Sequence, residues 1–194
     1  MATIPHKTQT TAVVIIPPRD AWGPIQSLRE QYDRQVRRWM PHITLLYPFR
    51  PVDQFPELRP HFERICADLE PFSLRLHKVH HFRHGRTRWT LWLDPIPHEP
   101  LRELVRRLQL AVPDCTDTGQ FPSGFTPHLS IGQSEGTKAF FALQAHLRAT
   151  WTPLSFPVDR VALIHRGEPP DDVFRVACEC RLGEGMPGRD RGCG

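Results

Sequence analysis

A short pattern of residues occurs twice in this chain, and the repetition restricts the ways in which the chain can fold. The first copy is PHITL at residues 41–45, and the second copy is PHLSI at residues 127–131. Successive side chains of a strand point to opposite faces, so the histidine and the hydroxyl residue of each copy share one face. An unpaired imidazole is costly in an apolar site. We therefore expect both polar faces to line one water-filled groove.

The predicted elements also follow one order twice. In the first half the order is strand 11–18, helix 24–36, the first motif strand, helix 56–69 and strand 71–79. The helix over 56–69 is expected to begin near Pro60. In the second half it is strand 88–97, helix 99–110, the second motif strand, helix 137–149 and strand 152–164. A last strand over 172–182 is predicted to form a hairpin with the strand before it. Self-similarity of this kind indicates an internal duplication.

The duplication predicts an α+β fold with two pseudo-symmetric lobes. Each lobe is expected to hold an antiparallel-rich sheet with helices on its outer face, and the active-site groove is expected to lie between the lobes. We expect a single bilobal domain over residues 1–182, with repeat halves of approximately 11–80 and 88–182. The Gly-rich, polar stretch 183–194 is predicted to be a disordered tail.

The composition is that of a soluble globular protein, with 39% hydrophobic and 24% charged residues. No apolar run is long enough to span a bilayer, and the first residues lack the features of a signal peptide. A net charge of +4 permits an anionic ligand or RNA without requiring one. The five cysteines have no framework spacing, which favours reduced thiols and a cytoplasmic location. We expect a monomer with no obligate protein partner.

Two imidazoles across one groove can supply a general base and a general acid, because histidine titrates near neutral pH. The hydroxyls of Thr44 and Ser130 can donate hydrogen bonds to the non-bridging oxygens of a phosphate held between the rings. This set of groups suits in-line phosphodiester chemistry: one histidine deprotonates the attacking water or hydroxyl, and the other protonates the leaving oxygen. Such chemistry requires no metal and no cofactor.

The repeated H-x-[T/S]-x motif, in a duplicated α+β chain of this length, resembles the two-histidine phosphoesterase superfamily. Within it, the chain is similar to the bacterial RNA 2′,3′-cyclic phosphodiesterases, historically named 2′-5′ RNA ligases. The resemblance covers roughly residues 12–182. It implies that His42 is the proton donor, that His128 is the proton acceptor, and that Thr44 and Ser130 bind the phosphate. Serine in place of threonine in the second motif is a variation that the family tolerates.

The resemblance implies hydrolysis of 2′,3′-cyclic phosphates on RNA 3′ ends or nucleotides to a 2′-phosphomonoester, and it leaves 2′-5′ ligation open. It does not fix the substrate, because relatives act on RNA ends, small cyclic nucleotides, ADP-ribose cyclic phosphate or 2′-5′ linkages.

One alternative is a non-catalytic RNA- or nucleotide-binding module of the same fold, which a lost histidine or hydroxyl would mark; none is lost here. Another is a metal-dependent hydrolase built on the histidines of residues 77–84. Adjacent histidines of a strand point to opposite faces, so a hairpin surface is favoured there.

Four further residues are candidates for substrate contacts. Arg38 precedes the first motif and could steer a phosphate, although a solvated helix end is the common role of such a segment. Arg166 follows the last long strand, where related proteins often place a basic or aromatic residue near the groove. Tyr47 and Phe125 flank the two motifs, and either could pack in the core or stack on a base.

Overall fold

The computed structural model describes residues 6–121 and 123–183. The described residues form two four-stranded antiparallel sheets and four α-helices, which confirms the predicted α+β class. Apart from Gly183, the predicted tail lies outside this part of the chain. None of the helices described is long and apolar enough to cross a membrane.

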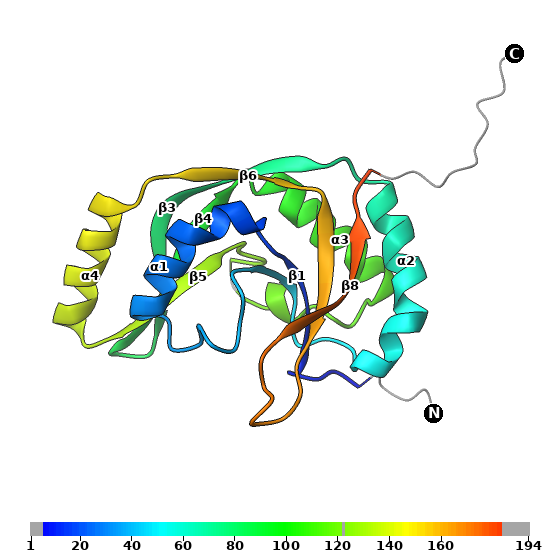
Figure 1. Cartoon of the computed structure of the whole chain (residues 1–194), viewed down its shortest axis with the longest axis horizontal. Helices are drawn as coiled ribbons and strands as arrows, with labels where there is room; N and C mark the ends of the chain where they lie inside the picture. The colour runs from blue at the N-terminus through cyan, green and yellow to red at the C-terminus, as the bar shows by residue number, and fades with distance from the viewer. Residues whose placement is uncertain (1–5, 122, 184–194) are drawn as a thin grey trace, which may run out of the picture.

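The first sheet has the strand order β2-β1-β7-β8. Its strands are β1 (Thr11–Ile15), β2 (Ile43–Leu46), β7 (Arg160–His165) and β8 (Arg175–Arg181). The helices α2 (Phe55–Ala67) and α3 (Glu99–Ala111) contact each other and pack beside this sheet, as Figure 1 shows. The apolar residues of β1 are buried on both faces of the sheet, because two separate apolar clusters cover it.

The second sheet has the strand order β5-β4-β3-β6. Its strands are β3 (Phe72–His84), β4 (Arg88–Ile96), β5 (Leu129–Glu135) and β6 (Leu154–Val158). The helices α1 (Trp22–Tyr32) and α4 (Thr137–Thr150) lie with this sheet (Figure 1). Three short 3₁₀ helices occupy connections: η1 (Arg19–Ala21), η2 (Val52–Gln54) and η3 (Asp117–Gly119).

The two halves of the sequence exchange strands. The order β2-β1-β7 in one sheet corresponds to β5-β4-β3 in the other, so each sheet takes its third strand from the opposite half. The helix α1 is exchanged as well, since it follows β1 in sequence but packs on β5. The sheets match the predicted lobes, while the halves 11–80 and 88–182 are interlocked between them. The domain boundaries themselves stay a prediction.

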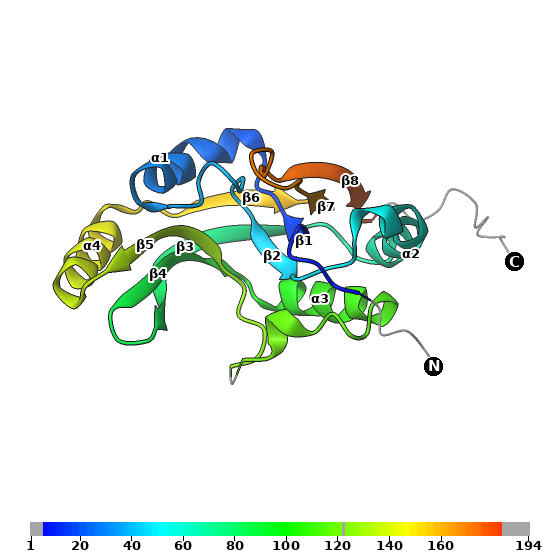
Figure 2. The ribbon, with the colours of Figure 1, turned by 90° about the horizontal axis from the view of Figure 1, so that it is seen from below.

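Several predicted boundaries were wrong. The helix expected over 24–36 spans Trp22–Tyr32. The strand expected over 152–164 is two strands, β6 and β7, which leave one sheet and enter the other on either side of Asp159 (Figure 2). The helix expected to begin near Pro60 begins at Phe55 and tolerates this proline inside it. The strand expected to end at Val79 continues to His84, because β3 pairs with β4 along that whole length.

A buried ion pair fixes the end of α1 and the segment that follows it. Arg29 donates from Nε to the Asp33 carboxylate over 2.9 Å, and both side chains are almost fully buried. Arg29 also donates to the carbonyl of Trp39 over 2.8 Å. Asp33 accepts a further hydrogen bond from the Gln133 amide on β5, over 3.1 Å. The chain leading to the first motif is therefore tied to the strand that carries the second.

Candidate active site

His42 immediately precedes β2 and Thr44 lies within it, on the same face, as the alternation predicts. Ile43 and Leu45 are buried in the core, while His42 and Thr44 are only half-buried. The Nδ1 atom of His42 lies 2.7 Å from the carbonyl oxygen of Met40. A carbonyl can only accept, so Nδ1 carries the proton and Nε2 is the nitrogen left for a ligand.

His128 and Ser130 repeat this arrangement at the start of β5. Leu129 and Ile131 are fully buried between and beyond them. The Nδ1 atom of His128 lies 2.9 Å from the carbonyl oxygen of Thr126, which again is two residues earlier in the chain. The two motifs thus share one local design, in which a backbone carbonyl selects the tautomer and Nε2 stays free.

The structure brings the two motif strands together. β2 and β5 belong to different sheets but contact each other. Beside them lies a cavity of about 570 Å³, and Thr44, His128 and Ser130 are among the side chains that line it. His42 does not line this cavity, although it lies close enough to His128 for the two charges to affect each other.

Burial disfavours the charged form of both imidazoles. The pKa of His42 falls from 6.5 to about 4, first because the ring is desolvated and then because Arg29 and His128 are nearby positive groups. The Met40 carbonyl and Asp33 oppose this change. Burial also lowers the pKa of His128, against a smaller opposing effect of the Thr126 carbonyl. Both rings are therefore neutral at pH 7 in the free protein, and an anion bound between them would favour their protonation.

The two imidazoles have different aromatic surroundings. His42 stacks on the indole of Trp39, with ring centroids 4.6 Å apart and 18° between the planes. The ring centroid of His128 lies 4.9 Å from that of Phe82, with 87° between the planes. It lies 5.9 Å from that of Trp92, with 62° between the planes. One ring is therefore supported on its face, and the other has only edge contacts.

The four further candidates divide into two groups. Tyr47 and Phe125 both line the cavity, as a base-stacking role requires. Arg38 does not line it, and its guanidinium pairs instead with the buried carboxylate of Asp172 at 2.6 Å. Arg166 also stays outside the lining and donates to the carbonyl of Gly167. Both arginines oppose the rise in the pKa of Tyr47 that burial causes, so their charges reach the cavity wall.

Sequence reasoning missed Phe82, His84 and Thr90, which line the cavity. The histidine-rich segment was predicted to be a hairpin surface; it lies in the β3–β4 hairpin, and residues 82–84 of the longer β3 line the cavity. His84 is fixed there by a contact of 3.0 Å between its Nε2 atom and the Thr90 hydroxyl. No periodic signal marked these residues, because the strand was expected to end at Val79.

The histidines of this segment are held separately. The Gln144 amide donates to Nδ1 of His81 over 2.7 Å, while His80 stacks on Trp92 with centroids 5.1 Å apart. In the part of the chain that the structure describes, no three His, Cys, Asp or Glu side chains gather as metal ligands would.

Comparison with known proteins decides the family. The family model of the 2′-5′ RNA ligase superfamily matches residues 17–170. The chain belongs to the 2′-5′ RNA ligase superfamily. Among relatives of this superfamily member, a protein of Geobacillus kaustophilus named "Putative phosphoesterase" is 26% identical over 157 residues, which cover 80% of this chain and 87% of the relative. A Bacillus cereus protein of the same name is 26% identical over 174 residues, covering 89% and 96%.

Solved structures share the fold of this superfamily member. TT0787 of Thermus thermophilus superposes with a TM-score of 0.62 at 20% identity, covering 91% of this chain and 99% of that one. E. coli LigT complexed with phosphate gives 0.59 at 16% identity, also over 91% and 99%. Family and fold together indicate a phosphoesterase-type enzyme.

Proposed function

We propose that this protein is a metal-independent phosphodiesterase that opens 2′,3′-cyclic phosphates on RNA 3′ ends or nucleotides to a 2′-phosphomonoester. The observation that carries the proposal is the matching backbone contact of the two imidazoles. Each has Nδ1 bound to the carbonyl two residues earlier, so each offers Nε2 beside a hydroxyl that lines the same cavity. A matched pair of this kind can act as base and acid on one phosphate.

In the proposed reaction, the hydroxyls of Thr44 and Ser130 hold the non-bridging oxygens of the cyclic phosphate. His128 takes a proton from a water molecule as the water oxygen bonds to phosphorus. The bond from phosphorus to the 3′ oxygen breaks, and His42 gives its proton to that oxygen. The product keeps the phosphate on the 2′ oxygen. Proton exchange with solvent then returns His128 to its neutral form, and His42 is protonated again when the next cyclic phosphate binds.

The proposed substrate is a nucleotide or the terminal nucleotides of an RNA. A cavity of about 570 Å³ is in the range of small-molecule sites. Its aromatic side chains, which include Tyr47, Phe82 and Phe125, offer rings on which a base could stack. LigT, which shares the fold, has been crystallised with 3′-AMP, ATP and NADP⁺. From the sequence arguments above, we further propose that the protein is a cytoplasmic monomer. We also propose that any 2′-5′ ligation, as the reverse reaction, would take place at this same site.

The test is turnover by the purified protein of a panel of 2′,3′-cyclic mononucleotides, a cyclic-ended RNA oligomer, ADP-ribose cyclic phosphate and a 2′-5′-linked dinucleotide. We expect a 2′-phosphomonoester from the cyclic substrates, with activity that survives EDTA. Tight binding without any product would favour the non-catalytic binding module. Loss of activity in EDTA with recovery in Zn²⁺ would favour a metal-dependent hydrolase.

A further inference from the structure

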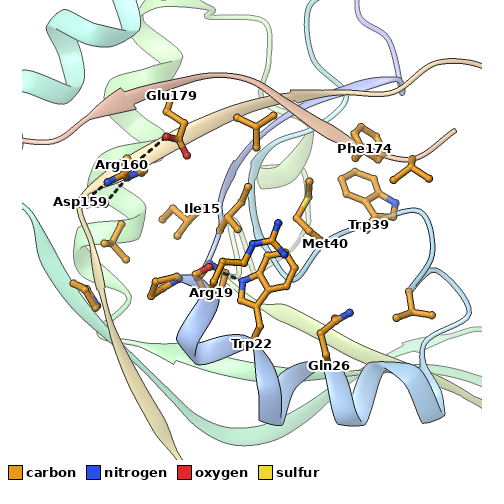
Figure 3. Close-up of a pocket in the computed structure, with 18 of the residues that line it drawn as sticks. Ile15, Arg19, Trp22, Gln26, Trp39, Met40, Asp159, Arg160, Phe174 and Glu179 are labelled. Carbon is orange, nitrogen blue, oxygen red and sulfur yellow. Dashed lines mark hydrogen bonds and ion pairs between the residues drawn. The ribbon is translucent and has the colours of Figure 1, made fainter. Parts of the chain in front are cut away.

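The indole of Trp39 lies between two other aromatic rings. On one side is His42, at 4.6 Å, and on the other is Phe174, at 3.7 Å and 27° between the planes. Figure 3 shows Trp39 and Phe174 side by side. The outer face of Phe174 is in turn 5.7 Å from the guanidinium carbon of Arg166. The imidazole therefore rests on a stack of rings that extends toward the β7–β8 connection.

The stack is fixed by the backbone as well as by its rings. The Phe174 amide donates to the carbonyl of Arg38 over 2.8 Å, next to Trp39 in the chain. Asp172, whose side chain is only 2% exposed, pairs with both Arg37 and Arg38. With Arg29 bound to the Trp39 carbonyl on the other side, the indole has little freedom to move.

We propose that Trp39, backed by Phe174, is a positioning residue that fixes the ring plane of His42. This inference rests on the proposed function, because it concerns the aim of the Nε2 atom toward a phosphate. The hydrogen bond from Nδ1 to the Met40 carbonyl fixes one nitrogen of the imidazole. The ring could still turn about this hydrogen bond, and stacking on the indole prevents that rotation. Positioning of this accuracy matters, since a misplacement of about 1 Å can cost a hundredfold in rate.

The stack also distinguishes His42 from His128. The indole covers one face of His42, so it orients the ring and keeps water from that face. His128 has edge contacts with Phe82 and Trp92 and lacks a face-to-face partner among the described aromatic contacts. Of the two imidazoles, the stacked support is therefore specific to His42.

Behind the stack lies a second cavity, of about 640 Å³, shown in Figure 3. Trp39 and Met40, the two residues that hold His42, both line it, as does Trp22 on α1. Removing the indole would join this cavity to the imidazole and admit water. Because desolvation is the main cause of the low pKa of His42, the pKa would then rise toward 6.5, while Arg29, Asp33 and His128 would keep their charges and places.

The experiment compares Trp39→Ala, Trp39→Phe and Phe174→Leu with the control Trp22→Ala. Trp22 lines the same cavity, but its indole donates to the Pro17 carbonyl and stacks under Arg19 instead of against His42. We expect Trp39→Ala to lower kcat/KM for a 2′,3′-cyclic mononucleotide by about ten- to a hundredfold, mainly through kcat. Trp39→Phe should recover most of this loss, Phe174→Leu should lose less than Trp39→Ala, and Trp22→Ala should match the wild type.

The readout specific to positioning is the titration of His42, followed by NMR of its ring nitrogens. Trp39→Ala should raise that pKa and scramble the Nδ1–H tautomer, and the control should do neither. An unchanged tautomer and pKa in Trp39→Ala, or in Phe174→Leu where the alanine variant does not fold, would overturn the inference. Absence of turnover by the wild type would instead overturn the proposed function, and the NMR titration would still test the role of Trp39.

Discussion

Gly132 of β5 and Tyr32 of α1 approach each other so closely that a side chain at Gly132 has no room. A Cβ atom built there would lie 2.5 Å from the Tyr32 Cβ and 2.9 Å from the Tyr32 carbonyl oxygen. The contact sets how α1, which comes from one half of the sequence, packs on the strand that carries Ser130. It therefore positions the first motif relative to the second.

Gly132→Ala is expected to destabilise the protein by about 1–3 kcal/mol, the usual cost of overpacking, because backbone atoms must shift. It should also lower kcat/KM, since the segment after α1 leads to His42. Chemical denaturation and steady-state kinetics measure the two effects. Gly23→Ala in α1, the helix of Tyr32, is the control, as its Cβ would meet no atom within 4 Å. Equal stability of the two variants would contradict this account of the contact.

His42→Ala and His128→Ala are each expected to lower turnover of a cyclic substrate by about 10²–10⁴, the range for a positioned acid or base. The double variant should lose little more than either single one, because both rings serve one step. Additive losses would argue against a shared step. His98→Ala, which removes a histidine bound to Asp94 instead, is the control for a nonspecific loss.

The pH profile of kcat/KM should have its optimum below pH 6.5. Burial lowers the pKa of both imidazoles, so the free enzyme at pH 7 holds both rings neutral, and the form with one proton becomes commoner as the pH falls. The test is to measure kcat/KM for a cyclic mononucleotide between pH 4 and 9 and to locate its optimum. An optimum at pH 7 or above would show that the two rings are not desolvated as described.

The same lowered pKa predicts a loss of stability in acid. Between pH 6.5 and 4 the unfolded chain binds a proton at His42 that the folded chain does not, so unfolding becomes easier as the pH falls through this window. The full effect at this residue is about 3 kcal/mol. The free energy of unfolding of His42→Asn should accordingly fall less than that of the wild type between pH 7 and 4. Parallel pH dependences for the two proteins would contradict the prediction.

Arg29→Ala is expected to cost about 3–5 kcal/mol, because it leaves the Asp33 carboxylate buried without its cation. Loss of the bond to the Trp39 carbonyl should also loosen the support of His42 and reduce kcat. Arg59→Ala is the matched control: it breaks an exposed pair with Glu63 at the same helical spacing, and stability should barely change. Similar melting temperatures for the two variants would show that the buried pair is not a structural tie.

The sequence was sufficient for the fold class and for the location of His42, Thr44, His128 and Ser130 at the starts of two strands. Local alternation and the repeat determine these features. The sequence could not predict that β3 and β7 are exchanged between the sheets. The alternation of a strand is the same whichever sheet the strand joins. The pairing of Arg38 with Asp172 and the stacking of Trp39 on Phe174 join segments more than 130 residues apart, and only the tertiary fold brings such segments together.

The exchange of strands between the halves limits how the protein can move. The chain passes from β6 in one sheet to β7 in the other within a single residue, Asp159, and β3 pairs with both β4 and β6. Opening the two sheets like a hinge would therefore strain the Asp159 connection and separate the apolar core that both sheets share. We expect substrate to enter through motions of the connections at the cavity rim, such as residues 117–121 and 123–126. Amide exchange should accordingly be fast in those connections and slow in β1, β3, β4 and β7, with no opening shared by a whole lobe.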